Sequence, residues 1–323
     1  MGIINAFPGG EPTKGYKRKV EITTSQTWTV PAGVTEIAVR LFGGGGSGAV
    51  GSYGAGGGGG HMAYAKLSVT PGTSYAIVIG AGGKAMSRKT EDPNGDYGRR
   101  GEDGGISRFG NILTAYGGGC GEGSDRYEGD GGSGGTGGGS FGWGSGYANS
   151  SDDDFTMGGA GTYGGGGGSG SVNVDAIAFG GVYGGNGGNY SALSQCGIES
   201  RGGKNQSDNS DTKEGCSGGG GGYRANGGDG WAYYTNSSLP YRRVAGGGGG
   251  GWEGGDGGSV VLGRRHGGGG GGYGPTKIAG DGISNDNTVD AYGGKGYGAG
   301  GGGGYYKSGN GAPGICIIEY FTY

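Results

Sequence analysis

The sequence predicts an all-β protein in which a small β-sandwich carries a glycine-rich bundle. Glycine supplies 102 of the 323 residues, tyrosine supplies 22, and segments that alternate apolar and polar residues stand near both ends of the chain. Each ordered glycine costs roughly 0.5–1 kcal/mol more than alanine, so a hundred of them need dense backbone hydrogen bonding as an offset. Collagen is excluded, because the glycines form runs without a Gly-X-Y period and only 8 residues are proline. The aromatic content argues against a disordered linker.

The first strand signals lie in the N-terminal third. Lys19–Val30 and Thr35–Phe42 show the period-2 alternation of half-buried strands, with Pro31–Gly33 as a turn between them. In the second strand, the alternation predicts one face with Ile37, Val39 and Leu41 and another with Glu36, Ala38 and Arg40. A second strand pair is predicted with its turn at Thr70–Gly72; its strands are Met62–Val69 and Tyr75–Gly80.

Two further segments complete the predicted sandwich. Ile106–Tyr116 indicates one more strand or a strand pair, and Gly314–Tyr323 is rich in β-branched and aromatic residues. We therefore expect residues 1–116 and 311–323 to form one β-sandwich domain, which the C-terminal strand closes.

Glycine runs dominate the predicted second domain, residues 117–310. They are Gly164–Gly168, Gly218–Gly222, Gly246–Gly251, Gly267–Gly272 and Gly301–Gly304, with similar runs at Gly43–Gly46 and Gly56–Gly60. We interpret each run as an extended, left-handed polyglycine segment near the polyproline II dihedrals. Such segments can hydrogen-bond side by side, because only glycine lets backbones approach so closely. The alternative is ordinary short strands with glycine-rich turns.

The segments between the runs are the candidate binding loops. The richest is Trp231–Val244, because Trp, Tyr and Arg dominate binding hot spots and Tyr with Ser and Asn suits adaptable recognition. Its candidate receptor-binding residues are Trp231, Tyr233, Tyr234, Tyr241, Arg242 and Arg243. The alternative is that these aromatic residues cap the end of the bundle. The loop Lys84–Asp103 adds Arg88, Tyr97, Arg99 and Arg100, and weaker candidates are Tyr147, Phe155, Tyr190 and Tyr292.

Other functions lack a sequence signal. The formal net charge of −3 gives no basic footprint for nucleic acid or anionic membrane. Cys120, Cys196, Cys216 and Cys316 lack metal-ligand spacing and are interpreted as buried thiols. Asp152–Asp154 indicates either a calcium site or, more simply, a solvated loop. We expect no cofactor, no resident metal, no enzyme activity, no signal peptide and no membrane insertion.

Specific segments resemble glycine-rich domains of bacteriophage tail fibres. They are TWTVPAGVTEIAVRL at 27–41, which a glycine run follows, residues 56–83, and GAPGICIIEY at 311–320. The opening MGIINAFPGG is similar to the start of tail-tip proteins from phages of Gram-positive bacteria. For residues 121–310 the resemblance is one of composition only.

This resemblance implies a receptor-binding protein of the virion, a tip adhesin that acts as a homotrimer beside other tail proteins. Its partner would be a bacterial surface carbohydrate or protein, bound through variable loops, so no individual residue role is carried over. The alternative is a purely structural component of the tail or capsid decoration. An ice-binding or matrix protein is disfavoured by the irregular spacing of the runs.

Overall fold

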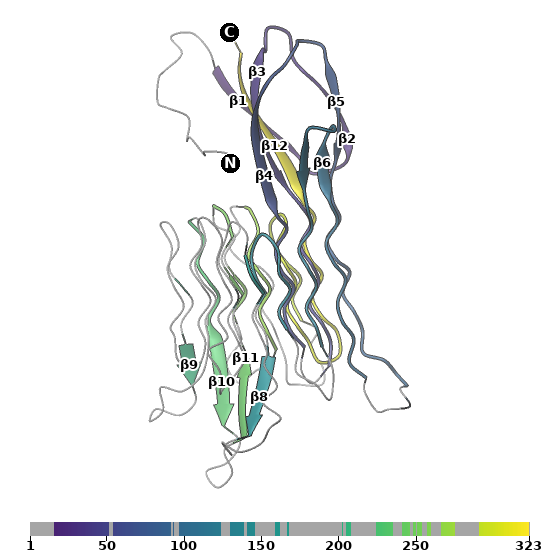
Figure 1. The fold of residues 1–323 in the computed structure, drawn as a ribbon, viewed down its shortest axis with the longest axis vertical. Helices are drawn as coiled ribbons and strands as arrows, with labels where there is room; N and C mark the ends of the chain where they lie inside the picture. The colour runs from purple at the N-terminus through teal and green to yellow at the C-terminus, as the bar shows by residue number, and fades with distance from the viewer. Residues whose placement is uncertain are drawn as a thin grey trace.

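The computed structural model contains three four-stranded sheets, and its described residues contain no helix (Figure 1). It describes residues 16–51, 54–91, 93, 97–123, 130–138, 141–145, 159–161, 167, 202, 205–207, 224–234, 241–245, 248–249, 251–253, 257–259, 266–274 and 291–322. The all-β prediction is therefore confirmed.

The first two sheets form a sandwich. In spatial order, the first contains β1 (Tyr16–Ile22), β12 (Ile315–Thr322), β3 (Glu36–Phe42) and β4 (Met62–Ser68), all antiparallel. The second contains β2 (Gln26–Thr29), β5 (Ser74–Val78), β6 (Ser107–Phe109) and β7 (Leu113–Ala115). As expected, the C-terminal strand completes the first sheet, but it lies between β1 and β3 and not at an edge.

The core lies between these two sheets. Ile37, Val39 and Leu41 of β3 are buried, and they pack with Phe109 from the second sheet and Ile318 from β12. The face assigned to these three residues is thus confirmed. The opposite face of β3 is more buried than a half-buried strand predicts: Ala38 is 3% exposed and Phe42 is fully buried.

The predicted strand pairs proved wrong in their connections. Residues 19–30 form two strands, β1 and β2, that belong to different sheets, and the turns at 31–34 and 70–73 connect one sheet to the other. In each turn the N–H of the fourth residue donates to the carbonyl of the first, and the third residue, Gly33 or Gly72, has φ +78° or +83°. This is the positive φ that a type II turn requires. Both turns therefore connect the two sheets of the sandwich. The strands before and after each turn bury their apolar residues in the core between these sheets.

Below the sandwich, the strands continue directly into extended glycine segments, which we call rods (Figure 1). The rod of residues 43–51 follows β3 and is buried throughout. The N–H groups of residues 43–50 donate with a period of three to the rods 55–61, 99–105 and 308–314, at N···O distances of 2.9–3.1 Å, whereas Gly51 N–H donates to Gly304. The carbonyls of residues 44–47 and Ala49 accept from the rods 80–86, 117–123 and 298–304, whereas the Val50 carbonyl accepts from Arg99 N–H.

This hydrogen-bond pattern is that of a polyglycine bundle. Three residues per turn is the polyproline II repeat, and it directs successive N–H groups to three different neighbours, so the rod 43–51 lies among six others. A Cβ on Gly48 would stand 2.1 Å from the carbonyl oxygen of Gly302. Only glycine permits that approach. The bundle interpretation is therefore confirmed for the described rods, and the domain boundary at residue 116 stays a prediction.

Hydroxyl groups take part in the bundle where the sequence departs from glycine. Thr136 Oγ1 donates to the Gly271 carbonyl at 2.6 Å and accepts from the Gly59 N–H at 3.2 Å. Ser107 Oγ accepts from Gly80 N–H and donates to the Phe42 carbonyl. These side chains satisfy buried backbone groups.

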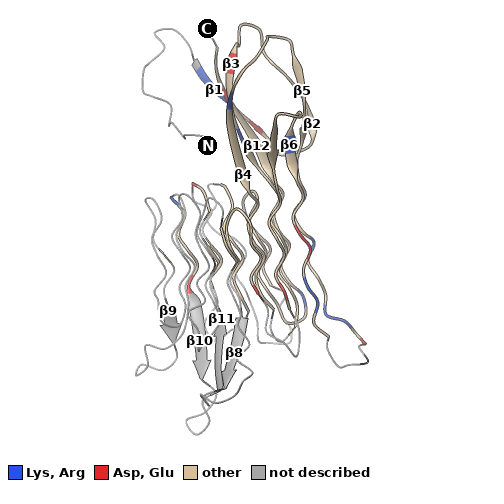
Figure 2. Cartoon of the chain, viewed as in Figure 1, with Lys and Arg blue, Asp and Glu red and all other residues tan. Residues whose placement is uncertain are grey.

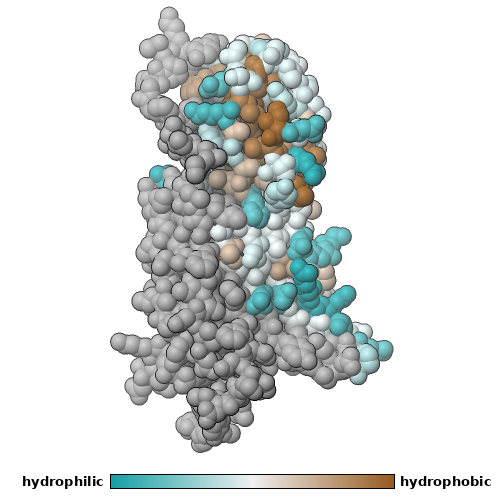
Figure 3. Space-filling view, in the orientation of Figure 1, coloured by the Kyte–Doolittle hydropathy of each residue, from teal (hydrophilic) through white to brown (hydrophobic). Residues whose placement is uncertain are grey.

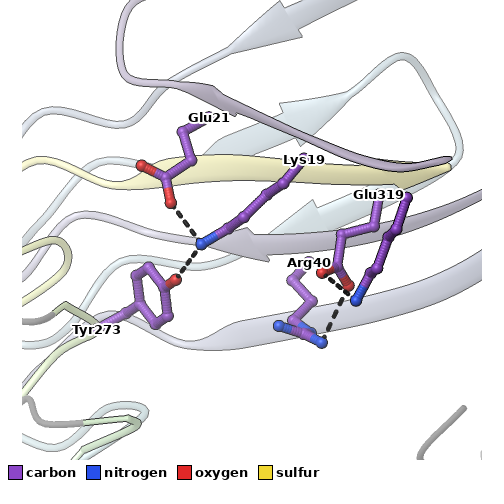
Figure 4. Close-up of polar contacts among 6 residues, drawn as sticks. Lys19, Glu21, Arg40, Tyr273 and Glu319 are labelled. Atoms are coloured by element: carbon purple, nitrogen blue, oxygen red, sulfur yellow. Dashed lines mark hydrogen bonds and ion pairs between the residues drawn. The ribbon is translucent and has the colours of Figure 1, made fainter.

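The bundle and the sandwich also share side-chain contacts. The ring of Tyr273, a bundle residue, stacks on Phe42 with centroids 5.0 Å apart, beside Ile315 of β12. Its hydroxyl accepts a hydrogen bond from Lys19 Nζ at 3.0 Å, and Lys19 also pairs with Glu21 (Figure 4). Although burial opposes the charged form, the hydrogen bonds to Glu21 and Tyr273 raise the pKa of Lys19. These contacts anchor β1 to the bundle.

A second ion cluster lies nearby on the same sheet face. The nearly buried carboxylate of Glu319 pairs with Lys17 Nζ at 2.8 Å and with Arg40 at 3.2 Å (Figure 4). The carboxylate thus joins three adjacent strands, because Lys17 is in β1, Glu319 in β12 and Arg40 in β3.

Candidate functional site

The third sheet contains the first group of candidate residues. It lies at the end of the bundle opposite the sandwich (Figure 1). In spatial order its strands are β8 (Phe141–Ser145), β11 (Tyr241–Ala245), β10 (Gly230–Tyr234) and β9 (Asn205–Ser207). Residues 231–234 and 241–244, expected in a loop, are therefore strand residues. Their sequence favours pairing, since Trp231, Tyr233, Tyr234 and Tyr241 are aromatic and Val244 is β-branched.

Backbone register divides these residues between the two faces of the sheet. Tyr233 is the partner of Arg243, which is in turn the partner of Trp143. Residues two apart in a strand share a face. By register, one face carries five aromatic positions and one arginine: Phe141, Trp143, Trp231, Tyr233, Tyr241 and Arg243. The other face carries Tyr234 and Arg242.

The second group of candidates lies on the flank of the bundle, where residues 84–89 form hydrogen bonds with residues 304–310 on one side and with Tyr97 and Glu102 on the other. Arg88 N–H donates to the Tyr306 carbonyl at 2.8 Å, and Lys89 N–H donates to the Tyr97 carbonyl at 3.0 Å. Figure 2 shows Lys and Arg gathered along this flank, and Figure 3 shows hydrophilic surface there, whereas apolar surface gathers over the sandwich.

An arginine surrounded by tyrosines forms the centre of this flank. The Arg88 guanidinium lies 4.0 Å from the centroid of the Tyr305 ring, 5.4 Å from that of Tyr97 and 6.0 Å from that of Tyr306. Such cation–π contacts attract the guanidinium of Arg88 to the faces of the tyrosine rings. Tyr305 and Tyr306 meet nearly at right angles, with centroids 4.8 Å apart. Tyr306 is 40% exposed.

The two neighbouring arginine candidates have different surroundings. Arg99 is exposed, and its backbone forms a pair of hydrogen bonds with Val50 that joins it to the central rod. Arg100 lies 3.8 Å from Asp103, whose carboxylate accepts a hydrogen bond from the Cys120 N–H. Burial, followed by the hydrogen bond to Asp103, raises the pKa of the Cys120 thiol to about 11. A thiol in this state is a poor nucleophile.

The structure therefore separates the predicted residues into two groups. Trp231, Tyr233, Tyr241 and Arg243 share a face of the third sheet, whereas Tyr97, Arg99 and Arg100 lie in the flank segment 97–103. Tyr292 is 49% exposed, with Lys295 Nζ 5.8 Å from its ring centroid. Tyr147, Asp152–Asp154, Phe155, Tyr190, Cys196 and Cys216 lie outside the described residues.

Two pairs of aromatic residues were missed in the sequence. Phe141 and Trp143 alternate with glycine, a period-2 signal that the surrounding glycine obscured. Tyr305 and Tyr306 directly follow the run Gly301–Gly304, and only the fold brings them beside Arg88.

The described residues contain neither a metal-binding cluster nor a membrane-spanning helix. In the part of the chain that the structure describes, no group of three or more His, Cys, Asp or Glu side chains is arranged to hold a metal ion. Over the same residues, no helix has the length and hydropathy to span a membrane.

A family model described as a glycine-rich domain matches residues 21–236, about two thirds of the chain. The chain belongs to the glycine-rich domain family. No curated protein sequence matches it. The matched region of this glycine-rich domain begins in β1 and ends two residues after β10, so it includes β2 to β7 of the sandwich and part of the bundle but not β12.

Proposed function

We propose that the protein is a receptor-binding protein of a phage tail fibre or tail tip, which attaches the virion to a bacterial surface carbohydrate or protein. The observation that carries the proposal is the sheet face with Trp143, Trp231, Tyr233 and Arg243 at the end of a rigid bundle. Aromatic and arginine residues are the types that anchor binding interfaces. The sequence resemblance to tail-fibre domains supports the same assignment.

The arrangement of the bundle favours binding at its distal end. The sandwich lies at the opposite end of the bundle from the third sheet, and in this proposal it attaches to other tail proteins (Figure 1). Backbone hydrogen bonds join each described rod to its neighbours, so the bundle offers the distal sheet a firm support. A rigid support lowers the entropy lost on binding. In this proposal the protein acts as a homotrimer, so three distal sheets multiply a weak single contact.

Cell binding tests this proposal. Fluorescently labelled full-length protein is incubated with a panel of Gram-positive and Gram-negative strains, and bound fluorescence is measured by flow cytometry. At least one strain should bind, and the double variant W231A/Y233A should bind at least about tenfold more weakly, the change expected from losing 1.4 kcal/mol.

The matched control changes the opposite face of the same sheet. The double variant Y234A/R242A should retain binding within about twofold, since these residues lie on the other face by register. Equal losses in both double variants would contradict the assignment of the face.

A structural virion component is the second candidate. The continuous hydrogen-bonded array favours it, because such an array resists proteolysis without any receptor. Absence of binding across the whole strain panel would favour this function over adhesion.

A further inference from the structure

The flank corner formed by Tyr305 and Tyr306 is a separate candidate site from the distal sheet. The two rings are perpendicular, at an interplanar angle of 89°. Tyr306 is exposed and Tyr305 is half-buried, so the pair presents the ring of Tyr306 and part of the ring of Tyr305 to solvent. The ring of Tyr305 also lies against the guanidinium of Arg88.

Backbone and cation–π contacts hold this corner in place before any ligand binds. Residues 87 and 307 form a β-bridge, and Arg88 N–H donates to the carbonyl of Tyr306. Next to it, Ser308 Oγ accepts a hydrogen bond from Met86 N–H at 2.9 Å. A preorganised pair of tyrosines offers contact area at low entropic cost.

The charge of the surrounding segment indicates the ligand class. Residues 84–103 contain five basic and five acidic residues, and Lys307 beside Tyr306 adds one further positive charge, so a net charge of +1 is too small to select a polyanion. Mixed donors and acceptors match hydroxyl groups, each of which donates and accepts. The weakly positive C–H groups of a sugar ring suit the negative face of an aromatic ring.

We infer that the Tyr305–Tyr306 corner, with Arg88, binds a neutral saccharide. The ring of Tyr306 stacks against the C–H face of one sugar residue, and the guanidinium of Arg88 holds the ring of Tyr305 beside it. This inference rests on the proposed function, for which it names the ligand class of a second contact region. The corner is small compared with the roughly 800 Å² per partner of a standard protein interface, which favours a sugar over a protein receptor.

Saturation-transfer NMR with full-length protein tests this inference. The probes are maltotetraose, cellotetraose and the tetramer of N-acetylglucosamine, with tetragalacturonate as the anionic comparison. At least one neutral probe should receive saturation at its ring C–H protons, with an affinity that changes less than twofold between 50 and 300 mM salt.

Variants of the corner connect this binding to Tyr306. Tyr306→Ala should weaken the binding at least about tenfold, whereas Tyr306→Phe, which keeps the ring, should stay within about twofold of wild type. Tyr116→Ala is the matched control, because Tyr116 is 61% exposed but lies near the sandwich. It should leave binding unchanged.

Three results would overturn the inference: no saturation transfer to any neutral probe, unchanged binding by Tyr306→Ala, or salt-sensitive binding of tetragalacturonate alone. Cell binding without saccharide binding would remove this inference and leave adhesion in place. Saccharide binding without cell binding would keep the saccharide site and remove adhesion.

Discussion

The tight packing of the central rod gives the sharpest stability prediction. A Cβ added to Gly46 would stand 2.2 Å from the carbonyl oxygen of Gly119, whereas ordinary contact begins near 3.4 Å. The rods 43–51 and 117–123 would then need to separate by about 1.2 Å, the difference between these two distances. Such a separation would break the hydrogen bonds from Gly118 N–H to Gly44 and from Gly121 N–H to Ser47, now 2.8 and 3.0 Å long.

Two broken bonds set the size of the effect. Each is worth about 1 kcal/mol net, and each leaves buried polar groups without partners at about 1–3 kcal/mol. Partial relaxation of the bundle reduces this sum, and overpacking of protein cores costs about 1–3 kcal/mol. We therefore expect Gly46→Ala to lower the free energy of unfolding by about 3 kcal/mol.

The control is a glycine with room for a methyl group. The nearest atom to a Cβ on Gly293 is the carbonyl oxygen of Asn310 at 3.4 Å, and Gly293 is not among the glycines with positive φ. Gly293→Ala should be neutral or stabilise by about 0.4–1 kcal/mol, because alanine restricts the unfolded chain. Denaturant unfolding followed by tyrosine and tryptophan fluorescence measures both variants. Equal stability of Gly46→Ala and Gly293→Ala would refute the role of close rod packing.

Three further predictions concern buried side chains. Thr136→Val should cost about 1–3 kcal/mol in denaturant unfolding, because the Gly271 carbonyl loses its donor; an unchanged midpoint would contradict this. Burial lowers the pKa of fully buried His266 to about 4, so the unfolded chain binds a proton between pH 6.5 and 4 that the folded protein does not. The free energy of unfolding should thus fall by about 1.5 kcal/mol from pH 6.5 to pH 5 because of His266. The variant His266→Gln should lack this part of the pH dependence. Cys120 and Cys316 are buried, and burial raises the pKa of their thiols to about 11 and 12. Peptide mapping after iodoacetamide treatment at pH 8 should therefore show both cysteines unmodified in the folded protein and modified after unfolding. Rapid labelling of the folded protein would disprove their burial.

Local sequence predicted the elements of the sandwich better than their connections. Alternation identified residues 35–42 as a strand, β-branched and aromatic composition identified residues 314–323, and Pro71 with Gly72 identified a turn. The same turn signal predicts either a hairpin or a crossover between sheets, because both need only a reversal of the chain. Which sheet each strand joins depends on the shared core, as Phe109 shows by packing between the layers.

The candidate sites show a similar limit. Trp231, Tyr233 and Arg243 were selected by residue type, yet only strand register divides them from Tyr234 and Arg242. Arg88 and Tyr305 are more than two hundred residues apart in sequence, and no local pattern connects them. Their contact exists because the rods that carry them are hydrogen-bonded neighbours.

The sequence by itself determined that the protein is all-β and that its glycines act through the backbone. Glycine has no side chain to pack, so ordering a hundred of them requires backbone hydrogen bonds as an offset. Only the tertiary structure decided which rods are neighbours, which sheet each strand joins and which aromatic residues share a face. Glycine runs are identical to one another locally, so their pairing is selected by the non-glycine residues at their ends and by the strands from which they continue.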